Sequence, residues 1–338
     1  MARICIVPQV SGVGGMVSFR ARFAAGLEQR GIQVCNNLDD TPYDAVLVIG
    51  GTRDLLGLRR VHRRGVRIVQ RLNGMNWIHR KRCTGLKHGL RAEYGNLILN
   101  TIRTRLADRI VYQSRFAQGW WERVYGRTRA AWKVVYNAVD LGQYSPQGPA
   151  ERPTDRQRLL LVEGSLGGGY EMGLDTAIEM AEILRLDHHQ AVELMVVGKV
   201  SPALQTAAQA KIQVPLIFSG KIPGEQIPQA DRSAHLLFAA DINAACPNST
   251  IEALACGLPV VAFDTGALPE LVSGDAGRVV PYGGNPWRLE PADVPGLARA
   301  ANEVLNDQPR FRQGARRRAE EAFGLDTMVE GYLACLLV

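Results

Sequence analysis

A short segment in the second half of the chain combines small polar residues with a carboxylate. Asn248, Ser249 and Thr250 are followed by Glu252, and the apolar stretch that they open ends at Gly257. This pattern predicts a helix start, where the first N–H groups have no partner inside the helix and attract anions such as phosphate. A carboxylate beside them can accept hydrogen bonds from hydroxyl groups. The same residues also fit a structural interpretation, in which Ser249 and Glu252 form a capping box.

A glycine-rich loop near the N-terminus is the second candidate. Gly14 and Gly15 follow the apolar run Ile4–Val7 and open a stretch with apolar residues at helical spacing. Glycines let the backbone approach a ligand closely, and a helix start adds a positive dipole end. The spacing is not G-x-G-x-x-G, because Val17 stands where the third glycine belongs. This disfavours a nucleotide-dependent oxidoreductase, which is a third interpretation of the chain.

Polar residues also follow another apolar run in the first half. Arg71 and Asn73 come shortly after the run 66–69, and His79 lies a few residues further on. In open α/β sheets ligands bind beyond the carboxyl ends of the strands, so these residues are candidates for contacts with a substrate. A lone His in a basic loop is more often exposed to solvent, and that interpretation of His79 stands beside the functional one.

Apolar runs and helical patterns alternate along the whole chain. Strands are predicted at 4–7, 45–49, 66–69, 109–112, 133–136, 159–162, 193–197, 216–218, 235–238, 259–263 and 278–280. Helices are predicted at 17–30, 174–186, 201–212, 249–256, 295–306, 310–322 and 327–337. Such alternation indicates βαβ units and parallel sheets. The predicted fold is α/β, with two doubly wound Rossmann-like domains facing a cleft. A polar, proline-containing stretch separates them, which gives domains at 1–145 and 155–325 and a C-terminal helix at 326–338.

Composition narrows the class of protein. The chain has 338 residues, of which 46% are hydrophobic and 22% charged, as in ordinary globular proteins. It has no apolar run long enough to span a membrane, and its first apolar run is too short for a signal peptide. The six cysteines show no C-x-x-C pairing, which argues against a structural zinc site and fits a reducing compartment. These features predict a cytoplasmic protein without a structural zinc site.

Charge is distributed unevenly between the two halves. Residues 1–150 contain 24 Lys and Arg against 9 Asp and Glu, whereas residues 151–338 contain 16 against 24. The basic half suggests an anionic partner, either a membrane surface, a phosphorylated acceptor or nucleic acid. Few aromatic residues interleave with the arginines, which disfavours nucleic acid. A solvated basic face without a partner is the alternative.

Three stretches of the sequence resemble the GT-B glycosyltransferases of family 4. They read ADRIVYQSRFAQGWWERVYG at 107–126, VVYNAVDLGQYSP at 134–146 and CPNSTIEALACGLPVVAFDTGALPELV at 246–272. The resemblance extends over nearly the whole chain and is most specific at 248–261. It implies a retaining hexosyltransferase that needs neither a metal nor a cofactor. Such an enzyme moves a sugar from a nucleotide diphosphate to a glycan or lipid-linked acceptor, at a membrane inner face or in the cytoplasm.

The resemblance also assigns roles to the candidate residues. It implies that the C-terminal domain binds the nucleotide sugar, with Glu252 on the ribose and the amides of Ser249 and Thr250 at the diphosphate. Asn248 is a further candidate for binding the donor. Gly14 and Gly15 would lie beside the transferred group, on the N-terminal domain that binds the acceptor. Arg71, Asn73 and His79 would face the acceptor, and the C-terminal helix would cross back onto the N-terminal domain.

Three positions depart from the family pattern. Ala244 replaces the first glutamate of its E-x7-E motif. After Gly164 the family has an Arg and, further on, a Lys, and these two residues neutralise the diphosphate. In this chain Ser165 and Met172 occupy those positions. Lys199 and Lys221, each just after a predicted strand, are candidate substitutes, although each also fits an ordinary surface lysine. The departures support an alternative, in which the chain is a non-catalytic GT-B protein that binds a nucleotide sugar or a partner.

Overall fold

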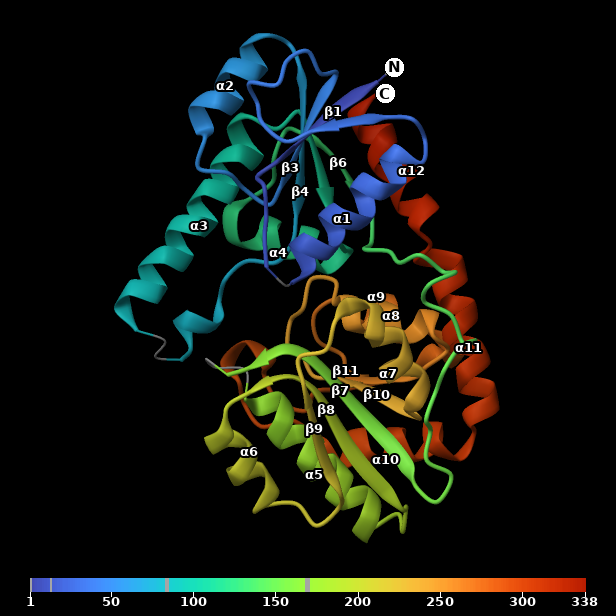
Figure 1. Cartoon of the computed structure of the whole chain (residues 1–338). Helices are drawn as coiled ribbons and strands as arrows, with labels where there is room; N and C mark the ends of the chain where they lie inside the picture. Colours follow the sequence, from blue (N-terminus) through green and yellow to red (C-terminus); the bar gives the residue numbers. More distant parts are fainter. Residues whose placement is uncertain (1, 13, 83–84, 168–170) are drawn as a thin grey trace. The chain divides into compact units, whose positions relative to one another are not determined.

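The computed structural model describes residues 2–12, 14–82, 85–167 and 171–338 (Figure 1). The chain divides into two compact units. The first consists of Met1–Ala138 together with Gly324–Val338, and the second of Val139–Phe323. Each unit contains a six-stranded sheet, and every strand pair in both sheets is parallel. The predicted class of two doubly wound α/β domains is therefore confirmed.

The sheet of the first unit has helices on both faces. Its strands run in the order β2-β1-β3-β4-β5-β6. They are β1 (Arg3–Val7), β2 (Gln33–Cys35), β3 (Ala45–Ile49), β4 (Arg67–Leu72), β5 (Arg109–Tyr112) and β6 (Ala131–Val134). Side chains alternate between the faces of a strand. Ile4 and Ile6 pack with α1 (Gly15–Glu28) and α12 (Leu325–Leu336). On the other face, Cys5 and Val7 pack with α2 (Leu55–Arg63) and α3 (Leu86–Arg105).

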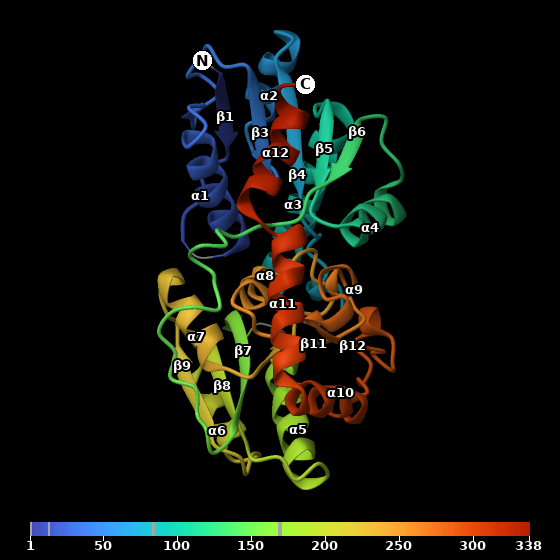
Figure 2. The ribbon, with the colours of Figure 1, turned by 90° about the vertical axis from the view of Figure 1, so that its right-hand side faces the viewer.

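The helix α12 belongs to the first unit although it ends the chain. Figure 2 shows it lying over the strands β3, β4 and β5, which it contacts. The ring of Tyr332 packs 5.1 Å from the rings of both Phe19 and Phe23 of α1. Arg30, just after α1, forms ion pairs with Asp326 at 2.7 Å and Glu330 at 3.1 Å. The C-terminal helix thus completes one face of this core.

The second unit repeats this architecture with the strand order β12-β11-β10-β7-β8-β9. Its strands are β7 (Gln157–Leu166), β8 (Val192–Val200), β9 (Leu216–Gly220), β10 (Leu236–Ala239), β11 (Val260–Phe263) and β12 (Gly277–Val280). Leu159 and Leu161 face a core formed with α5 (Met172–Leu186) and α10 (Val294–Asn306). On the opposite side, α8 (Asn248–Ala255) packs on β10 and β11, and against α7 (Ile227–Ser233) and α11 (Gln308–Ala322).

Shorter elements and connections complete the two units. They are α4 (Arg115–Tyr125) and η1 (Ile78–Arg80) in the first unit, and α6 (Pro202–Gln209), α9 (Leu268–Leu271), η2 (Gly224–Gln226), η3 (Gly274–Ala276) and η4 (Pro286–Arg288) in the second. Across the described ranges, no helix combines the length and the apolar character needed to cross a bilayer.

Arginine side chains hold the segment that enters the second unit. Arg232 of α7 donates from Nε to the Pro149 carbonyl at 3.0 Å and from Nη1 to the Ser145 carbonyl at 3.2 Å. Arg316 of α11 donates from Nη1 to the Tyr144 carbonyl at 2.9 Å. Guanidinium groups are well suited to this role because they offer several donors in a fixed plane. The polar stretch after residue 139 is therefore bound to the second unit over its first part.

Some predicted elements are displaced or were missed. The strand predicted at 133–136 is β6 at Ala131–Val134, whose residues are mostly exposed and carry little apolar signal. The strand β2 has three residues and was not predicted. Five helices were also missed: α2, α3, α4 and α7, in which charged residues interrupt the apolar pattern, and α9, which has only four residues.

Candidate functional site

Each sheet has one point where the strand order reverses. In the first unit β1 has β2 on one side and β3 on the other, and in the second unit β7 lies between β8 and β10. The chain therefore leaves these central strands in opposite directions. In open α/β sheets, ligands bind beyond the carboxyl ends of the strands at such points. Each unit thus has one half-site, between β1 and β3 or between β7 and β10.

The half-site of the first unit begins with a glycine loop after β1. Gly14 has a φ of +142° and precedes α1, which begins at Gly15. A side chain would be strained in this conformation, although the space beside Gly14 is open. Among the described residues no side chain caps this helix start, so its first N–H groups are available to a ligand. Val13 of the same loop lies outside the described residues.

Two further loops meet this helix start. Gly50 directly follows β3, with a φ of +69°. A Cβ atom added to Gly50 would lie 3.6 Å from the Met16 sulfur and 3.7 Å from the Asn73 side-chain oxygen. The loops after β1, β3 and β4 therefore converge, and the structure brings Gly15 and Asn73 to one edge of the sheet.

Arg71 lies inside the first unit and not at its surface. Its side chain is 1% exposed, donates from Nη2 to the side-chain oxygen of Asn137 at 2.9 Å, and lies 3.9 Å over the ring of Phe19. The prediction of an acceptor-facing Arg71 therefore needs correction. The strand β4 extends to Leu72, so Arg71 still belongs to the sheet and points into packed side chains.

His79 is also buried, contrary to the interpretation of a solvent-exposed residue. Its side chain is 6% exposed, and Nε2 lies 2.9 Å from the Glu93 carboxylate of α3. Arg80 donates from Nε to the same carboxylate at 2.6 Å. These contacts, with Arg80 the stronger, lower the pKa of Glu93 to about 2. An ionised carboxylate that fixes one ring nitrogen orients an imidazole and sets its tautomer.

The half-site of the second unit contains Ser165, at the position where the resemblance predicts a basic residue. Gly164 and Ser165 lie in the exposed end of β7. In the sheet Ser165 is paired with Lys199 of β8, whose side chain is exposed. Lys221 follows β9, the outermost strand on that side, and is separated from β7 by β8. Gly168 and Gly169 of the same loop lie outside the described residues.

Two carboxyl groups at the half-site of the second unit were not predicted as site residues. Glu163 lies near the end of β7, and Asp241 follows β10, the neighbouring strand. Burial raises the pKa of both carboxyl groups, and the charge of Asp241 raises that of Glu163 further. Two carboxyl groups in such surroundings resist losing both of their protons, and a pair that keeps one proton can both donate and accept hydrogen bonds. An acid directly after an apolar run was the sequence signal for each.

The predicted helix start is present in α8. The helix begins at Asn248, and Asn248 and Ser249 are partly exposed. It follows β10 through a loop, so it starts at the carboxyl edge of the sheet. The capping-box interpretation is wrong, because Pro247 occupies the cap position and, within the described part of the chain, no side chain caps this start. Thr250 is fully buried, and its hydroxyl has no hydrogen-bond partner among the described residues.

Glu252 is less accessible than the sequence suggested. Its side chain lies on α8 and is 8% exposed. Its charge acts on Asp231 of the neighbouring α7. The residue therefore lies mostly under protein, and a hydroxyl group of a ligand would have to reach its small exposed part.

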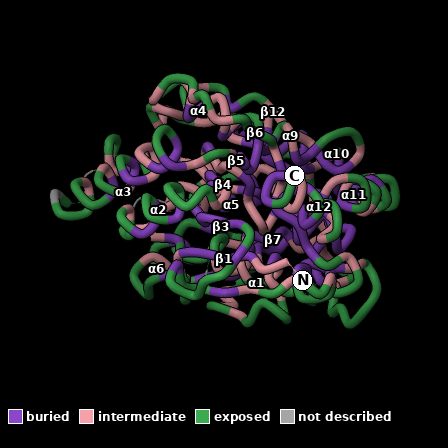
Figure 3. The backbone as a smooth tube through the Cα atoms, turned by 90° about the horizontal axis from the view of Figure 1, so that it is seen from above, coloured by how far each residue is buried: buried purple, intermediate pink, exposed green. Residues whose placement is uncertain are grey.

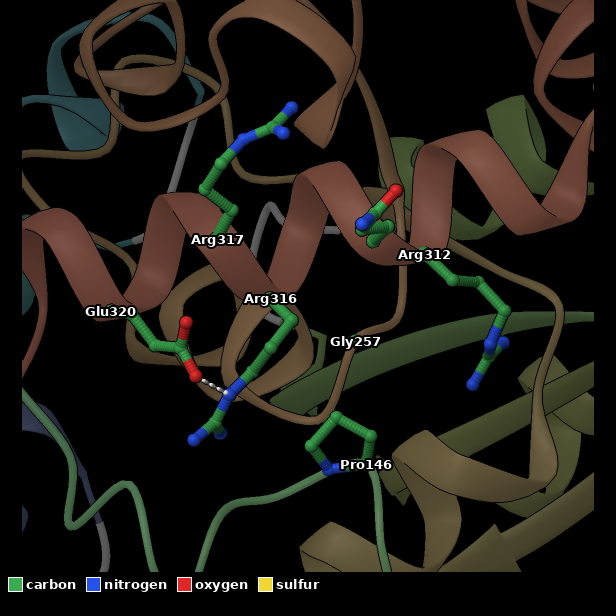
Figure 4. A pocket seen from close by; sticks show the side chains of 7 residues that line it. Pro146, Gly257, Arg312, Arg316, Arg317 and Glu320 are labelled. Atoms are coloured by element: carbon green, nitrogen blue, oxygen red, sulfur yellow. Dashed lines mark hydrogen bonds and ion pairs between the residues drawn. The ribbon is translucent and has the colours of Figure 1, made fainter.

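A hollow of about 460 Å³ in the second unit lies away from these residues (Figure 4). Arg312, Arg316 and Arg317 of α11 line it, with Gly257 at the far end of α8. Arg316 donates to the carbonyl of Ala255 at 2.7 Å and pairs with Glu320 at 2.6 Å. The guanidinium of Arg316 thus already has partners within the protein. The hollow is a junction between helices and contains none of the predicted site residues. Within the described residues no three His, Cys, Asp or Glu side chains gather as metal ligands would.

Comparison with known proteins finds similarity to glycosyltransferases. Residues 157–307 match the sequence profile of the family described as glycosyl transferases group 1. A D-inositol 3-phosphate glycosyltransferase from Nocardia farcinica (strain IFM 10152) is 27% identical over 251 residues, which are 68% of this chain. The matched segment spans about half of that protein, 53% of its length.

Solved structures share the fold of the whole chain. Sucrose-phosphate synthase from Thermosynechococcus elongatus aligns with a TM-score of 0.74 at 16% identity, covering 99% of this chain and 98% of the other. Anabaena HepE, solved with UDP and glucose, aligns with a TM-score of 0.69 at 16% identity over 99% of both chains. WaaG, a glycosyltransferase involved in lipopolysaccharide biosynthesis, gives 0.72 at 16% identity over 99% of both chains. The chain has the two-domain GT-B fold of these structures, and its residues 157–307 are similar to the group 1 glycosyltransferases.

Proposed function

We propose that this protein transfers a hexose from a nucleotide diphosphate sugar to a glycan or lipid-linked acceptor, with retention of configuration, as family 4 enzymes do. The observation that carries the proposal is the start of α8. Its partly exposed first turn lies at the carboxyl edge of the second sheet, one turn before Glu252. Free amides suit a diphosphate and a carboxylate suits ribose hydroxyls. HepE, which shares the fold, was solved with UDP and glucose.

The donor would lie across the end of the second sheet. The amides at Ser249 and Thr250 would hold the diphosphate, and the glycine-lined end of β7 at Gly164 would let it approach the backbone. Lys199 would supply positive charge beside Ser165. Helix-start amides and a cation stabilise a leaving diphosphate without requiring a metal or a cofactor. A leaving phosphate can itself take the acceptor proton.

The acceptor would be bound by the first unit. Gly14, Gly15 and Asn73 line its half-site, and His79 is held in a fixed orientation beside Glu93. A hydroxyl group of a saccharide would find hydrogen-bonding partners there. We place the transferred sugar beside Gly14 because a side chain at that position would restrict its approach.

A lipid-linked acceptor would bring the first unit to an anionic membrane surface. The helix α3 is exposed over much of its length (Figure 3). Leu90, Tyr94 and Leu97 follow one another at helical spacing and are 73%, 53% and 57% exposed. Lys87 and Arg91 lie beside them and are exposed as well. An apolar stripe with basic flanks is typical of helices that lie in a membrane interface. We therefore place the protein in the cytoplasm, on the membrane inner face.

A second candidate function is binding without catalysis. Ala244, Ser165 and Met172 remove a carboxylate and two cations from the expected donor site. A protein of this kind would still bind a nucleotide sugar at α8, but it would neither hydrolyse nor transfer the sugar.

The experiment that separates these functions uses a panel of UDP-, GDP- and ADP-sugars. Thermal stabilisation by one donor, followed by slow release of the nucleoside diphosphate, supports a transferase. Nuclear magnetic resonance of the released sugar then shows whether its first-formed anomer retains the donor configuration. Stabilisation without release supports the binding protein. No stabilisation by any donor contradicts both.

A further inference from the structure

Asp231 is a buried acid next to the proposed nucleotide half-site. It lies on α7 and is 1% exposed. Neither of its carboxyl oxygens has a well-formed hydrogen bond within the described residues. The Cys256 thiol lowers the pKa of Asp231, but this effect is smaller than those of burial, Glu252 and Arg232. An ionised carboxylate accepts hydrogen bonds and cannot donate them, so in this place it would be almost unsatisfied.

The neighbouring cation does not neutralise Asp231. Arg232 follows it on α7, but its guanidinium donates to the carbonyls of Pro149 and Ser145 at 3.0 and 3.2 Å. These bonds hold the entering segment of the second unit and direct the charge away from the acid. The attraction of Arg232 is therefore a smaller influence on the pKa of Asp231 than burial is.

The groups on the facing helices favour a neutral Asp231. Glu252 of α8 adds negative charge, and burial together with Glu252 raises the pKa of Asp231 well above its usual range. Cys256, one turn further along α8, is fully buried, and burial with Asp231 beside it raises the pKa of its thiol. Arg316 of α11 acts on Cys256 while it donates to the Ala255 carbonyl. Burial and the facing carboxylate therefore favour the protonated form of Asp231.

A protonated carboxyl group is a donor that needs an acceptor. Glu252 of α8 and Cys256 just after it both act on Asp231, and a carboxylate is a stronger acceptor than a thiol. Building on the nucleotide binding proposed above, we propose that Asp231 is a positioning residue for this site. Its O–H donates to one oxygen of Glu252 and directs the other oxygen toward the ribose hydroxyls of the nucleotide.

This arrangement accounts for the small exposed fraction of Glu252. Only 8% of the residue is exposed, which suffices if one oxygen faces the ligand and the other is held inside by Asp231. A carboxylate fixed at one oxygen loses less freedom when it binds a hydroxyl group than a freely rotating one does. Asp231 would thus raise the affinity for a ribose without touching it.

The test compares two ligands that differ only in the hydroxyl groups. UDP and 2′,3′-dideoxy-UDP are titrated into the full chain by calorimetry, for the wild type, Asp231→Leu and Asp231→Asn. We expect Asp231→Leu to weaken UDP binding about tenfold, the usual worth of a hydrogen bond to a charged group, and to leave dideoxy-UDP binding unchanged. Asp231→Asn keeps an N–H donor and should stay within about threefold of the wild type.

A purely structural role for Asp231 would change the affinity for both ligands equally, or for neither, and would overturn the inference. If the wild type bound UDP no more tightly than dideoxy-UDP, or bound neither, the ribose contact of Glu252 would fail and the inference with it. The wild type alone gives a second measurement if Asp231→Leu does not fold. Its preference for UDP should fall as alkaline pH removes the proton from Asp231, whereas the preference of Asp231→Asn should stay constant. A constant wild-type preference would also overturn the inference.

Discussion

Lys199 is the cross-strand neighbour of Ser165 in the parallel sheet of the second unit. The resemblance described above predicts an arginine at the position of this serine, and the structure places the cation of Lys199 one strand away. Lys199 is exposed at the carboxyl end of β8, where its flexible side chain can reach over the end of β7. The second substitute suggested by the sequence, Lys221, lies beyond the outer strand β9.

Replacing Lys199 should therefore impair transfer more than replacing Lys221. We expect Lys199→Met to lower kcat about 100-fold, the usual effect of losing one group that stabilises a leaving anion, with little change in thermal stability. Lys221→Met is the matched control and should stay within about twofold of the wild type, because β8 separates it from β7. Rates are measured as release of the nucleoside diphosphate. Equal losses in both variants would show that neither lysine is specific to the site.

The carboxyl pair of Glu163 and Asp241 should make the second unit less stable as the pH rises. Both pKa values are raised in the folded protein, so the folded state holds more protons than the unfolded state above about pH 4. Stability must then fall with rising pH until the pair is ionised, by at most about 1.4 kcal/mol per pH unit for one proton. Glu163→Gln removes the repulsion between the two groups. The melting temperature of Glu163→Gln, relative to that of the wild type, should increase between about pH 5 and about pH 8.

The control for that series is Glu225→Gln, at an exposed position of the same unit. Its melting temperature should follow the wild type at every pH. If Glu163→Gln also followed the wild type, the two carboxyl groups would not share a proton in the folded protein.

Loss of Arg316 should destabilise the second unit. The guanidinium donates to the carbonyls of Leu141, Tyr144 and Ala255, at 3.3, 2.9 and 2.7 Å from Nη1. Arg316→Met leaves these acceptors without a donor, which should cost about 2–4 kcal/mol. Limited proteolysis should then cut the segment that begins at Val139 more rapidly. Arg317, whose side chain points away from Arg316 in Figure 4, is exposed and gives the control Arg317→Met, which should melt like the wild type. Equal melting of the two variants would contradict this role of Arg316.

The exposed face of α3 should bind anionic membranes. The double variant Leu90→Ser, Leu97→Ser removes two of its apolar side chains and should weaken binding to vesicles of phosphatidylglycerol and phosphatidylcholine at least about tenfold. Leu56→Ser on α2 is the control, because Leu56 is 76% exposed but lies on another helix. Cosedimentation measures the bound fraction. Unchanged binding of the double variant, or no binding by the wild type, would exclude this face.

The buried strands of the fold could be predicted from sequence, but its exposed elements could not. The strand β3 lies at Ala45–Ile49 as predicted, because all five residues are buried and apolar. By contrast β2 contains three residues with an exposed Gln33, and α2 contains Arg59, Arg60 and Arg63, which hide its apolar face. Exposed elements are stabilised by what they pack against, and that information is not local.

The candidate site shows the same division. The start of α8 has a local signature, and the structure contains it within one residue of the prediction. The relationship between Glu163 and Asp241 depends on which strands are neighbours in the sheet, and Asp231 looks like an ordinary polar residue of a short helix. Burial of Arg71 and His79 likewise follows from packing by segments distant in sequence, Asn137 and Glu93 among them. Composition and spacing do not encode such contacts directly.

The return of α12 to the first unit has a consequence for biosynthesis. During translation, the sheet of that unit emerges long before the helix that covers it, since all of Val139–Phe323 is made in between. Until then the surface formed by Phe19, Phe23 and their neighbours is open to water and to other proteins. The nascent chain therefore carries an unprotected apolar face through most of its synthesis, and premature termination after the second unit would leave a species prone to aggregate.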